Sequence, residues 1–278
     1  MNTATAVSLD AGWSAFLKLG FRPAPGKTVL AKRQRFGPLA VQRPFYPEGE
    51  ICHVYLLHPP GGVAGGDQLQ IEAELACGSH ALVTTPGATK FYRSAGSLAQ
   101  QVQHLQVADG ASLEWMPQEN IFFPGAKVST RTLVDLSGSA RLAFWEMHCL
   151  GRPVIDEAFE QGTLDSRLDI RRGGRPLLIE RLRIDSESRL RSSLLNGQPV
   201  TATAVFSHAD AGHLDKARAC IDVAQAQVAG ATLVEDLLVV RYLGESTELA
   251  RNLFTDIWRV LRESLLNRPA SVPRIWST

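Results

Sequence analysis

The sequence predicts a mainly β fold, in which many short strands form one sandwich, barrel or coil and two helices lie near the C-terminus. Three observations support this prediction. Apolar and polar residues alternate with a period of two along most of the chain, which is typical of strands with one buried face. Turns containing Gly or Pro interrupt the alternation at short intervals, and helical periodicity is found only in the last quarter of the chain.

The alternation predicts a succession of strands that begins near the N-terminus. They are expected at residues 13–19, 27–35, 51–57, 69–75, 80–85, 113–116, 128–136, 141–150, 164–171 and 177–184. Val102 and Leu105 are out of phase by one residue, which predicts a β-bulge between them. The pair Asp109 and Gly110 predicts a hairpin turn.

The last quarter of the chain changes to a helical period. The apolar face of a first helix consists of Leu214, Ala217, Ile221, Ala224 and Val228. A strand pair is expected at residues 231–242, and Ser246 is a candidate N-cap for a second helix that ends at about residue 266. Because no linker-like segment divides the chain, we expect a disordered lead at residues 1–12 and one domain over residues 13–278.

Composition and charge favour a globular protein that binds neither nucleic acid nor a membrane. The 29 basic and 28 acidic residues nearly balance, and no basic-aromatic array is present. No apolar run approaches the roughly 20 residues that cross a bilayer, and the first ten residues do not resemble a signal peptide. The four cysteines form no CxxC pair, which argues against structural zinc. We therefore expect a cytoplasmic protein with reduced thiols.

Residues 58–67, with the sequence HPPGGVAGGD, hold four glycines and two prolines and end at Asp67. A second patterned loop, TTPGATKFYRS, follows at residues 84–94. The chain contains neither GxxxxGK[ST] nor GxGxxG, and Asp67 would repel a phosphate, so no nucleotide site is expected. GxSxG is also absent from the sequence. These loops are interpreted as a shaped surface, and a plain connector is the alternative.

Three acidic residues are candidates for metal chemistry. Period two places Glu146 and His148 on the same apolar face of the strand at 141–150. Glu180 likewise interrupts the apolar face of the strand at 177–184, and Asp67 lies beside flexible backbone. Carboxylate and imidazole suit divalent ions such as nickel, zinc or manganese. The alternative is pairing of these acids with Arg141, Arg152, Arg181 or Arg183.

The second loop is also a candidate interface. Lys90, Phe91, Tyr92 and Arg93 place two aromatic side chains between two cations directly after a Pro-Gly turn. Tyr and Arg are enriched at protein interfaces, where aromatic side chains often carry much of the binding energy. The alternative is that these aromatic side chains belong to the core.

Taken together, the motifs resemble those of the urease accessory protein UreD family, called UreH in some organisms. The resemblance extends from about residue 13 to the last residue. The matching motifs are GPL at residues 37–39, YPEG at 46–49, HPPGG at 58–62, GGD at 65–67, TTPGATKFYR at 84–93, EWMPQE at 114–119, WE at 145–146, GRP at 151–153, RYLG at 241–244 and PRIWST at 273–278.

The resemblance implies a scaffold for urease maturation and not an enzyme. Family members form a complex with UreF and the GTPase UreG, which docks on apo-urease and assists GTP-dependent insertion of nickel. The resemblance also implies a coiled-sheet or β-helix-like fold, no tightly bound cofactor, and an internal path for transient nickel(II). Our own hypothesis is that this path is lined by Asp67, Glu146 and Glu180, together with Thr84, Thr85, Glu119 and His148.

Two other functions fit the residues. A metal-dependent hydrolase on a β scaffold would use Glu146 and His148, and would bind metal tightly without partners. A β-sandwich ligand-binding module would use the loop at residues 58–67 as its rim.

Overall fold

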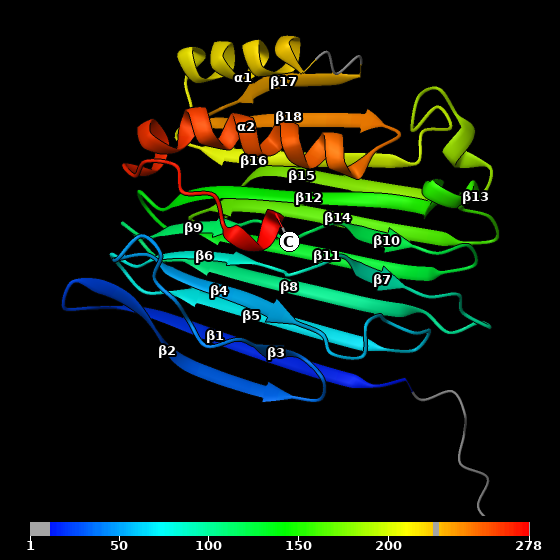
Figure 1. Ribbon diagram of the computed structural model, residues 1–278, viewed down its shortest axis with the longest axis horizontal. Coiled ribbons are helices and arrows are strands. Elements are labelled where there is room, and N and C mark those ends of the chain that lie inside the picture. Colours follow the sequence, from blue (N-terminus) through cyan, green and yellow to red (C-terminus); the bar gives the residue numbers. More distant parts are fainter. Residues whose placement is uncertain (1–11, 225–227, 278) are drawn as a thin grey trace, which may run out of the picture.

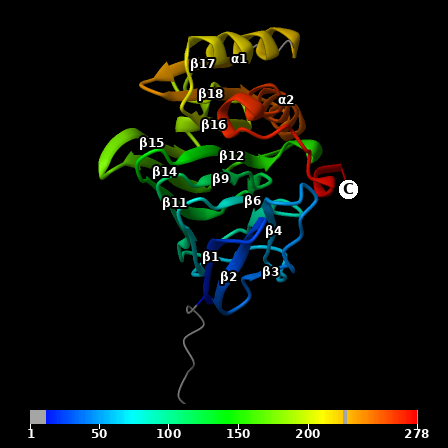
Figure 2. The ribbon, with the colours of Figure 1, turned by 90° about the vertical axis from the view of Figure 1, so that its left-hand side faces the viewer.

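Two stacked β-sheets and two helices make up the computed structural model, which describes residues 12–224 and 228–277. Figure 2 shows β11 and β14 in one sheet, β6, β9 and β12 in the other, and the helices on the outer side of the latter. The expected disordered lead falls almost wholly outside the described residues. Within them, no helix is long and apolar enough to cross a membrane.

The first sheet has seven strands in the order β15-β14-β11-β8-β5-β1-β2. Its central neighbours run parallel, and antiparallel pairs close both edges. In chain order the strands are β1 (Ser14–Ala24), β2 (Lys27–Phe36), β5 (Gln68–Leu75), β8 (Ala99–Val107), β11 (Lys127–Leu136), β14 (Thr163–Arg172) and β15 (Arg175–Asp185).

The second sheet follows the order β17-β18-β16-β12-β9-β6-β4-β3, and β7, β10 and β13 attach beside this path. Its longest strand, β12, pairs with parallel β9 on one side and antiparallel β16 on the other. In chain order the strands are β3 (Ala40–Val41), β4 (Cys52–Leu57), β6 (His80–Thr84), β7 (Thr89–Phe91), β9 (Ser112–Trp115), β10 (Asn120–Phe122), β12 (Arg141–Arg152), β13 (Glu157–Ala158), β16 (Val200–Ser207), β17 (Ala229–Val234) and β18 (Leu237–Gly244).

The chain coils between the two sheets from β4 to β14. β4, β6, β9 and β12 lie parallel in one sheet, while β5, β8, β11 and β14 lie parallel in the other. Each strand therefore returns to its own sheet by way of the opposite one, as in a β-helix. The prediction of a β-rich, coiled-sheet fold is confirmed (Figure 1).

Two local predictions are wrong. Asp109 and Gly110 do not close a hairpin, because β8 and β9 on either side of them lie in different sheets. β8 also has no bulge: its register with β5 and β11 is regular from residue 99 to 107. Val102 faces outwards and Leu105 inwards, and the inward positions between Ala99 and Leu105 are occupied by glutamines.

The apolar side chains form two cores on opposite faces of the second sheet. On β12, Leu142 and Phe144 belong to the core between the sheets, whereas Trp145 and Met147 belong to the core beneath the helices. The second sheet is thus covered on both faces, while the first sheet has one face in solvent. This explains the clear alternation in strands such as β5, where buried and accessible residues follow one another.

Both helices begin after a capping residue, and the cap of the second is the one that the sequence predicts. α1 (Ala211–Val223) starts after Asp210, which forms a capping box with His213, and α2 (Thr247–Leu266) starts after the predicted cap Ser246. α1 is about one turn shorter than predicted, because Val228 precedes β17 instead of continuing the helix. Three short 3-10 helices complete the fold: η1 (Pro153–Ile155), η2 (Ser188–Leu190) and η3 (Arg274–Ser277).

A buried charge network attaches α2 to the second sheet. Glu114 on β9 accepts hydrogen bonds from Trp258 Nε1 (2.7 Å) and from Arg262 Nε and Nη2 (3.0 and 2.8 Å). Arg262 also pairs with Glu48, and His80 Nε2 lies 2.8 Å from the Glu114 carboxylate. Burial alone would raise the pKa of Glu114, but its hydrogen bond with His80 and the charges of His80 and Arg262 lower that pKa to about 2.

Candidate functional site

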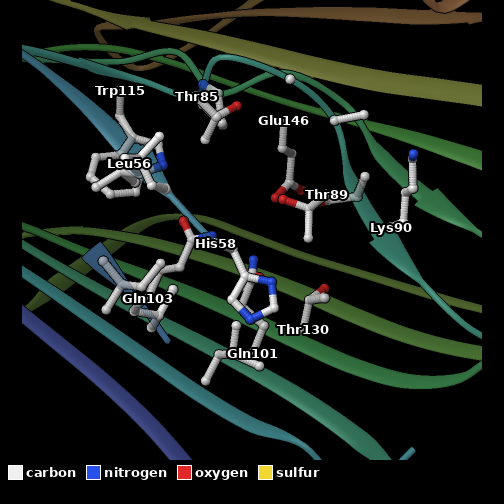
Figure 3. A pocket seen from close by; sticks show the side chains of 18 of the residues that line it. Leu56, His58, Thr85, Thr89, Lys90, Gln101, Gln103, Trp115, Thr130 and Glu146 are labelled. Carbon is white, nitrogen blue, oxygen red and sulfur yellow. The ribbon is translucent and has the colours of Figure 1, made fainter. Parts of the chain in front are cut away.

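A cavity of about 230 Å³ lies between the two sheets. The first sheet contributes Gln101 and Gln103 from β8 and Thr130 and Thr132 from β11 to its wall. Gln101, Thr130 and Thr132 are each at most 7% exposed, so polar side chains occupy positions where core residues are expected. In Figure 3, Gln101 and Thr130 lie opposite the carboxylate of Glu146, which enters the cavity from the second sheet.

The glycine-rich loop closes one side of this cavity. His58, Gly61 and Gly62 line the cavity, and Figure 3 shows the His58 imidazole inside it. A Cβ at Gly62 would lie 2.3 Å from the ring of Tyr92, so the loop packs too closely there for any side chain. Burial lowers the pKa of His58, although the charge of Asp67 opposes that shift. The loop is therefore a close-packed bend that places a half-buried imidazole at the cavity.

Glu146 on β12 lines this cavity and also a second one, of about 350 Å³. Its side chain is 18% exposed. Burial, followed by the charge of Glu180, raises the pKa of Glu146 to about 7. Near neutral pH the carboxyl group is therefore divided between its protonated and charged forms.

His148, two residues further along β12, faces the second cavity as period two predicts. Its Nε2 lies 3.1 Å from Ser166 Oγ and 3.8 Å from Glu146 Oε1. Thr130 Oγ donates in turn to Ser166 Oγ at 2.9 Å, which links this imidazole to the wall of the first cavity. Burial lowers the pKa of His148 to about 4, so the ring is neutral at physiological pH.

Glu180 on β15 reaches the second cavity from the opposite sheet. Arg241 on β18 donates a hydrogen bond to Glu180 Oε1, and Thr203 Oγ on β16 lies 3.5 Å from Oε2. Ion pairing with an arginine was one of the alternatives for this acid, but its partner is Arg241, which the sequence interpretation did not consider. The predicted candidates pair elsewhere: Arg181 and Arg183 with Asp165, and Arg152 with Glu157.

Asp67 is absent from the residues that line either cavity. Its Oδ1 accepts a hydrogen bond from the backbone N–H of Trp13 and its Oδ2 accepts one from that of Ala64, each at 2.8 Å. The carboxylate therefore fixes the turn that ends the glycine-rich loop. Its connection with the cavity is electrostatic, through its effect on the pKa of His58.

The remaining path residues lie in different places. Thr85 lines the first cavity, and its Oγ accepts from the backbone N–H of Gln118. The hydroxyl of Thr84 donates a hydrogen bond to the carbonyl of Met116 and accepts one from Trp276 Nε1 in the C-terminal segment. Thr84 is not among the residues that line the first cavity. Glu119 lines an external cleft, and its Oε2 is buried without a hydrogen-bond partner among the described residues.

That external cleft measures about 1,100 Å³ and runs beside β10, β12 and β13. Glu119 and Cys149 lie along it, together with the exposed apolar residues Val154 (96% exposed) and Ile155 (59%) of η1. Lys90 lines both this cleft and the first cavity. The cleft thus adjoins the interior site on one side and solvent on the other.

The loop at residues 90–93 only partly fits the interface hypothesis. Lys90, Tyr92 and Arg93 are exposed. Phe91 does not fit, because it is fully buried and stacks on Phe122 with ring centroids 5.0 Å apart. Strand alternation explains the difference: β7 directs Phe91 into the core between its accessible neighbours.

Sequence reasoning missed several residues of the site. They are His58, Thr89, Gln101, Gln103, Thr130, Ser166, Thr203 and Arg241. A signal for two of them is present in the sequence, since Gln101 and Gln103 fall in phase with the buried Ala99, Leu105 and Val107. His58 and Arg241 approach from other parts of the coil, which single-strand periodicity does not reveal.

Glu146, His148 and Glu180 offer carboxylate oxygens and a neutral imidazole, which are ligands for divalent cations. Within residues 12–224 and 228–277, no three His, Cys, Asp or Glu side chains are grouped closely enough to hold a metal ion. Together, the coiled double sheet and this row of separate polar groups define a β-solenoid-like scaffold whose apolar interior contains polar cavities.

Comparison with known proteins identifies the family of this scaffold. A family model described as "UreD urease accessory protein" matches residues 14–277. Proteins named urease accessory protein UreD are 50% identical in Pseudomonas putida strain W619 (97% of this chain, 96% of that protein) and 48% identical in Alcanivorax borkumensis (96% and 93%). One from Klebsiella aerogenes is 47% identical (97% and 98%). The chain belongs to the UreD family of urease accessory proteins.

Proposed function

We propose that this chain is a cytoplasmic, non-catalytic scaffold through whose interior nickel(II) passes on its way into apo-urease. Its partners are UreF, the GTPase UreG and the urease apoprotein, and GTP hydrolysis belongs to UreG. Membership of the UreD family supports the role in urease maturation. The resemblance of the sequence motifs supports the choice of partners.

One observation carries the proposal of an interior path: Glu146 lines both cavities between the sheets. From Glu146 the first cavity extends to His58 and the glycine-rich loop, and the second extends to Glu180 and Arg241 at the opposite side of the coil. An ion that enters by either cavity therefore meets the same carboxylate.

The donor groups suit a cation that must also leave. A closed set of four strong ligands would retain nickel, whereas single carboxylates and hydroxyls spaced along a passage bind it weakly. Glu146 can release its proton when the ion arrives, because its pKa lies near 7. The neutral ring of His148 is ready to donate a nitrogen lone pair without first losing a proton.

The test replaces Asp67, Glu146 and Glu180 together with alanine in the full chain, which is co-expressed with urease and the accessory proteins. We expect urease activity and nickel content to fall while the accessory complex still co-purifies. The double variant Glu146→Ala/Glu180→Ala and the single variant Asp67→Ala then show which of these acids causes the loss of nickel content and urease activity. Because Asp67 fixes a turn outside the cavities, we expect its variant to lower protein yield more than nickel delivery per complex.

Normal nickel content in the triple variant, with the complex intact, would contradict the proposal. Tight stoichiometric metal and turnover in the isolated chain would instead favour the hydrolase that uses Glu146 and His148. Asp256→Ala is the matched control, since this exposed acid on α2 is paired with Arg259 and lines neither cavity.

A further inference from the structure

We propose that Arg241 is a resident counter-ion which occupies the cation position at Glu180 and is exchanged for the metal ion when one arrives. The inference rests on the proposed function, because it concerns the same interior path. In this proposal, Arg241 controls the release of the metal ion from Glu180 at the end of the second cavity.

The guanidinium cation of Arg241 already occupies the position beside Glu180 that a metal ion would take. Glu180 comes from β15 at the edge of the first sheet, while Arg241 and Thr203 are register partners on β18 and β16 of the second. The guanidinium group contacts Oε1, and the Thr203 hydroxyl lies at 3.5 Å from Oε2. Both carboxylate oxygens are thus occupied across the gap between the sheets. An incoming ion can use Glu180 fully only if the guanidinium group moves away.

The surroundings of Arg241 allow that movement. Its side chain is 50% exposed, against 24% for Glu180, so the guanidinium group can leave the carboxylate and be hydrated. Half-exposed ion pairs contribute little net free energy, because solvent compensates for most of the interaction that is lost. Arginine also keeps its charge at any physiological pH, so the competing cation is always present.

Exchange solves a problem that any ion path faces. A single carboxylate without a counter-ion would bind the next ion more tightly and release it more slowly than one with a counter-ion, since no charged group would replace the departing ion. A tethered guanidinium group lowers the net affinity of Glu180 for metal and returns to it after release. Arg241 is therefore a positioning residue that acts through Glu180, and it needs no direct contact with nickel.

Arg181 provides a matched comparison. It also lines the second cavity and is 45% exposed, similar to Arg241. Its guanidinium group is held by Asp165 through two hydrogen bonds of 2.9 and 2.6 Å. Removing Arg181 therefore takes away a nearby positive charge without freeing Glu180.

The test measures Ni²⁺ binding to the full chain by isothermal titration calorimetry and nickel delivery to urease in cells. In Arg241→Gln we expect the dissociation constant to fall roughly fivefold, because the competing ion pair is lost. Arg181→Gln is expected to change it less than twofold. Arg241→Lys, which restores the charge without the planar fork, should lie between Arg241→Gln and the unchanged chain. Urease nickel content should fall in Arg241→Gln despite its tighter binding.

The variant Glu180→Gln separates this inference from the proposed function. Suppose that Glu180→Gln weakens Ni²⁺ binding but Arg241→Gln has no effect, or no more effect than Arg181→Gln. The proposed exchange at Arg241 is then contradicted, while the proposed interior path is not. If neither Glu146→Gln nor Glu180→Gln alters binding or delivery, the path itself is wrong. In the double variant Glu180→Gln/Arg241→Gln, the gain in Ni²⁺ affinity that Arg241→Gln causes must disappear. If it persists, Arg241 does not act through Glu180.

Discussion

Glu146 on β12 and Glu180 on β15 come from opposite sheets and line the same cavity, and the charge of Glu180 contributes to raising the pKa of Glu146 to about 7. Two carboxylates that share a poorly hydrated space resist simultaneous ionisation. A divalent cation between them would relieve that repulsion. The same arrangement that destabilises the metal-free protein therefore favours transient binding of a cation.

Glu146→Gln should stabilise the metal-free protein above neutral pH. The folded-state pKa of about 7 lies above the ordinary value of 4.5, so the folded state binds more protons between these values. Stability therefore falls as pH rises from about 4.5 through 7. Urea unfolding with a chelator present should show the variant more stable at pH 8, by at most about 3 kcal/mol, and little changed at pH 4. The same gain for Glu263→Gln, an exposed α2 control, would contradict this.

Glu180→Gln should lower the pKa of Glu146. Removal of the Glu180 charge eliminates one cause of the raised pKa and leaves the cation of Arg241 without its partner nearby. Both changes favour the ionised form of Glu146. NMR titration of carbon-13-labelled glutamate should place its midpoint at a lower pH in the variant. An unchanged midpoint would show that the two acids do not interact.

Arg262→Met should weaken the attachment of α2 to the second sheet and lower the free energy of unfolding by more than the loss of one surface ion pair does. Arg262 is fully buried and pairs with Glu114 and Glu48, and its loss would leave these two acids with their histidine partners but without the guanidinium charge. We expect a loss of about 3–5 kcal/mol in the free energy of unfolding. Arg259→Met, which breaks the exposed pair with Asp256, is the control and should change stability by less than about 1 kcal/mol.

The same network predicts acid sensitivity. The pKa of Glu114 is lowered to about 2 from its ordinary 4.5, so its stabilising contribution is complete above the unfolded-state value. It is lost progressively as pH falls from about 4.5 to 2. In Glu114→Gln the loss of stability over this range, measured by thermal unfolding, should be smaller than in the unchanged chain. An equal loss would contradict this assignment.

Gly62→Ala should disturb the glycine-rich loop, whereas Gly87→Ala should not. The added Cβ at Gly62 would lie 2.3 Å from the Tyr92 ring and 3.0 Å from the Lys90 carbonyl, but at Gly87 nothing lies within 4 Å. We expect a cost of about 1–2 kcal/mol at Gly62, as for other overpacked positions. Chemical denaturation of both variants is the measurement, and equal stability would contradict close packing of the loop.

Local patterns in the sequence predicted most elements of the fold, because alternation and capping depend on neighbouring residues. Ser246 caps α2 as expected, and Glu146 and His148 share an inward face as period two requires. The predicted hairpin at Asp109 is wrong because a turn motif does not determine whether the chain pairs with the preceding strand or crosses to the other sheet. That choice depends on the parallel coil as a whole.

The site was less predictable for the same reason. Glu180 interrupted an apolar row, which was visible in the sequence, but its partner Arg241 is 61 residues away on the opposite sheet. Asp67 is a candidate from the sequence because it ends the glycine-rich run, but its oxygens accept hydrogen bonds from the backbone N–H groups of Trp13 and Ala64. The phase of Val102 and Leu105 predicts a bulge, whereas the strand is regular and its inward positions include Gln101 and Gln103, which line the first cavity.

The most direct test of the interior path is to fill it while leaving every acid in place. Thr130 lines the first cavity and reaches Ser166 beside His148, so Thr130→Phe would place a ring in the passage. Thr130→Val is the control, since it removes the hydroxyl and adds no bulk. The measurement is nickel per urease active site after co-expression, with co-purification confirming the accessory complex. The proposed path predicts a marked loss for Thr130→Phe and near-normal nickel for Thr130→Val. Normal nickel in both variants, with the complex intact, would contradict passage of the ion through this chain.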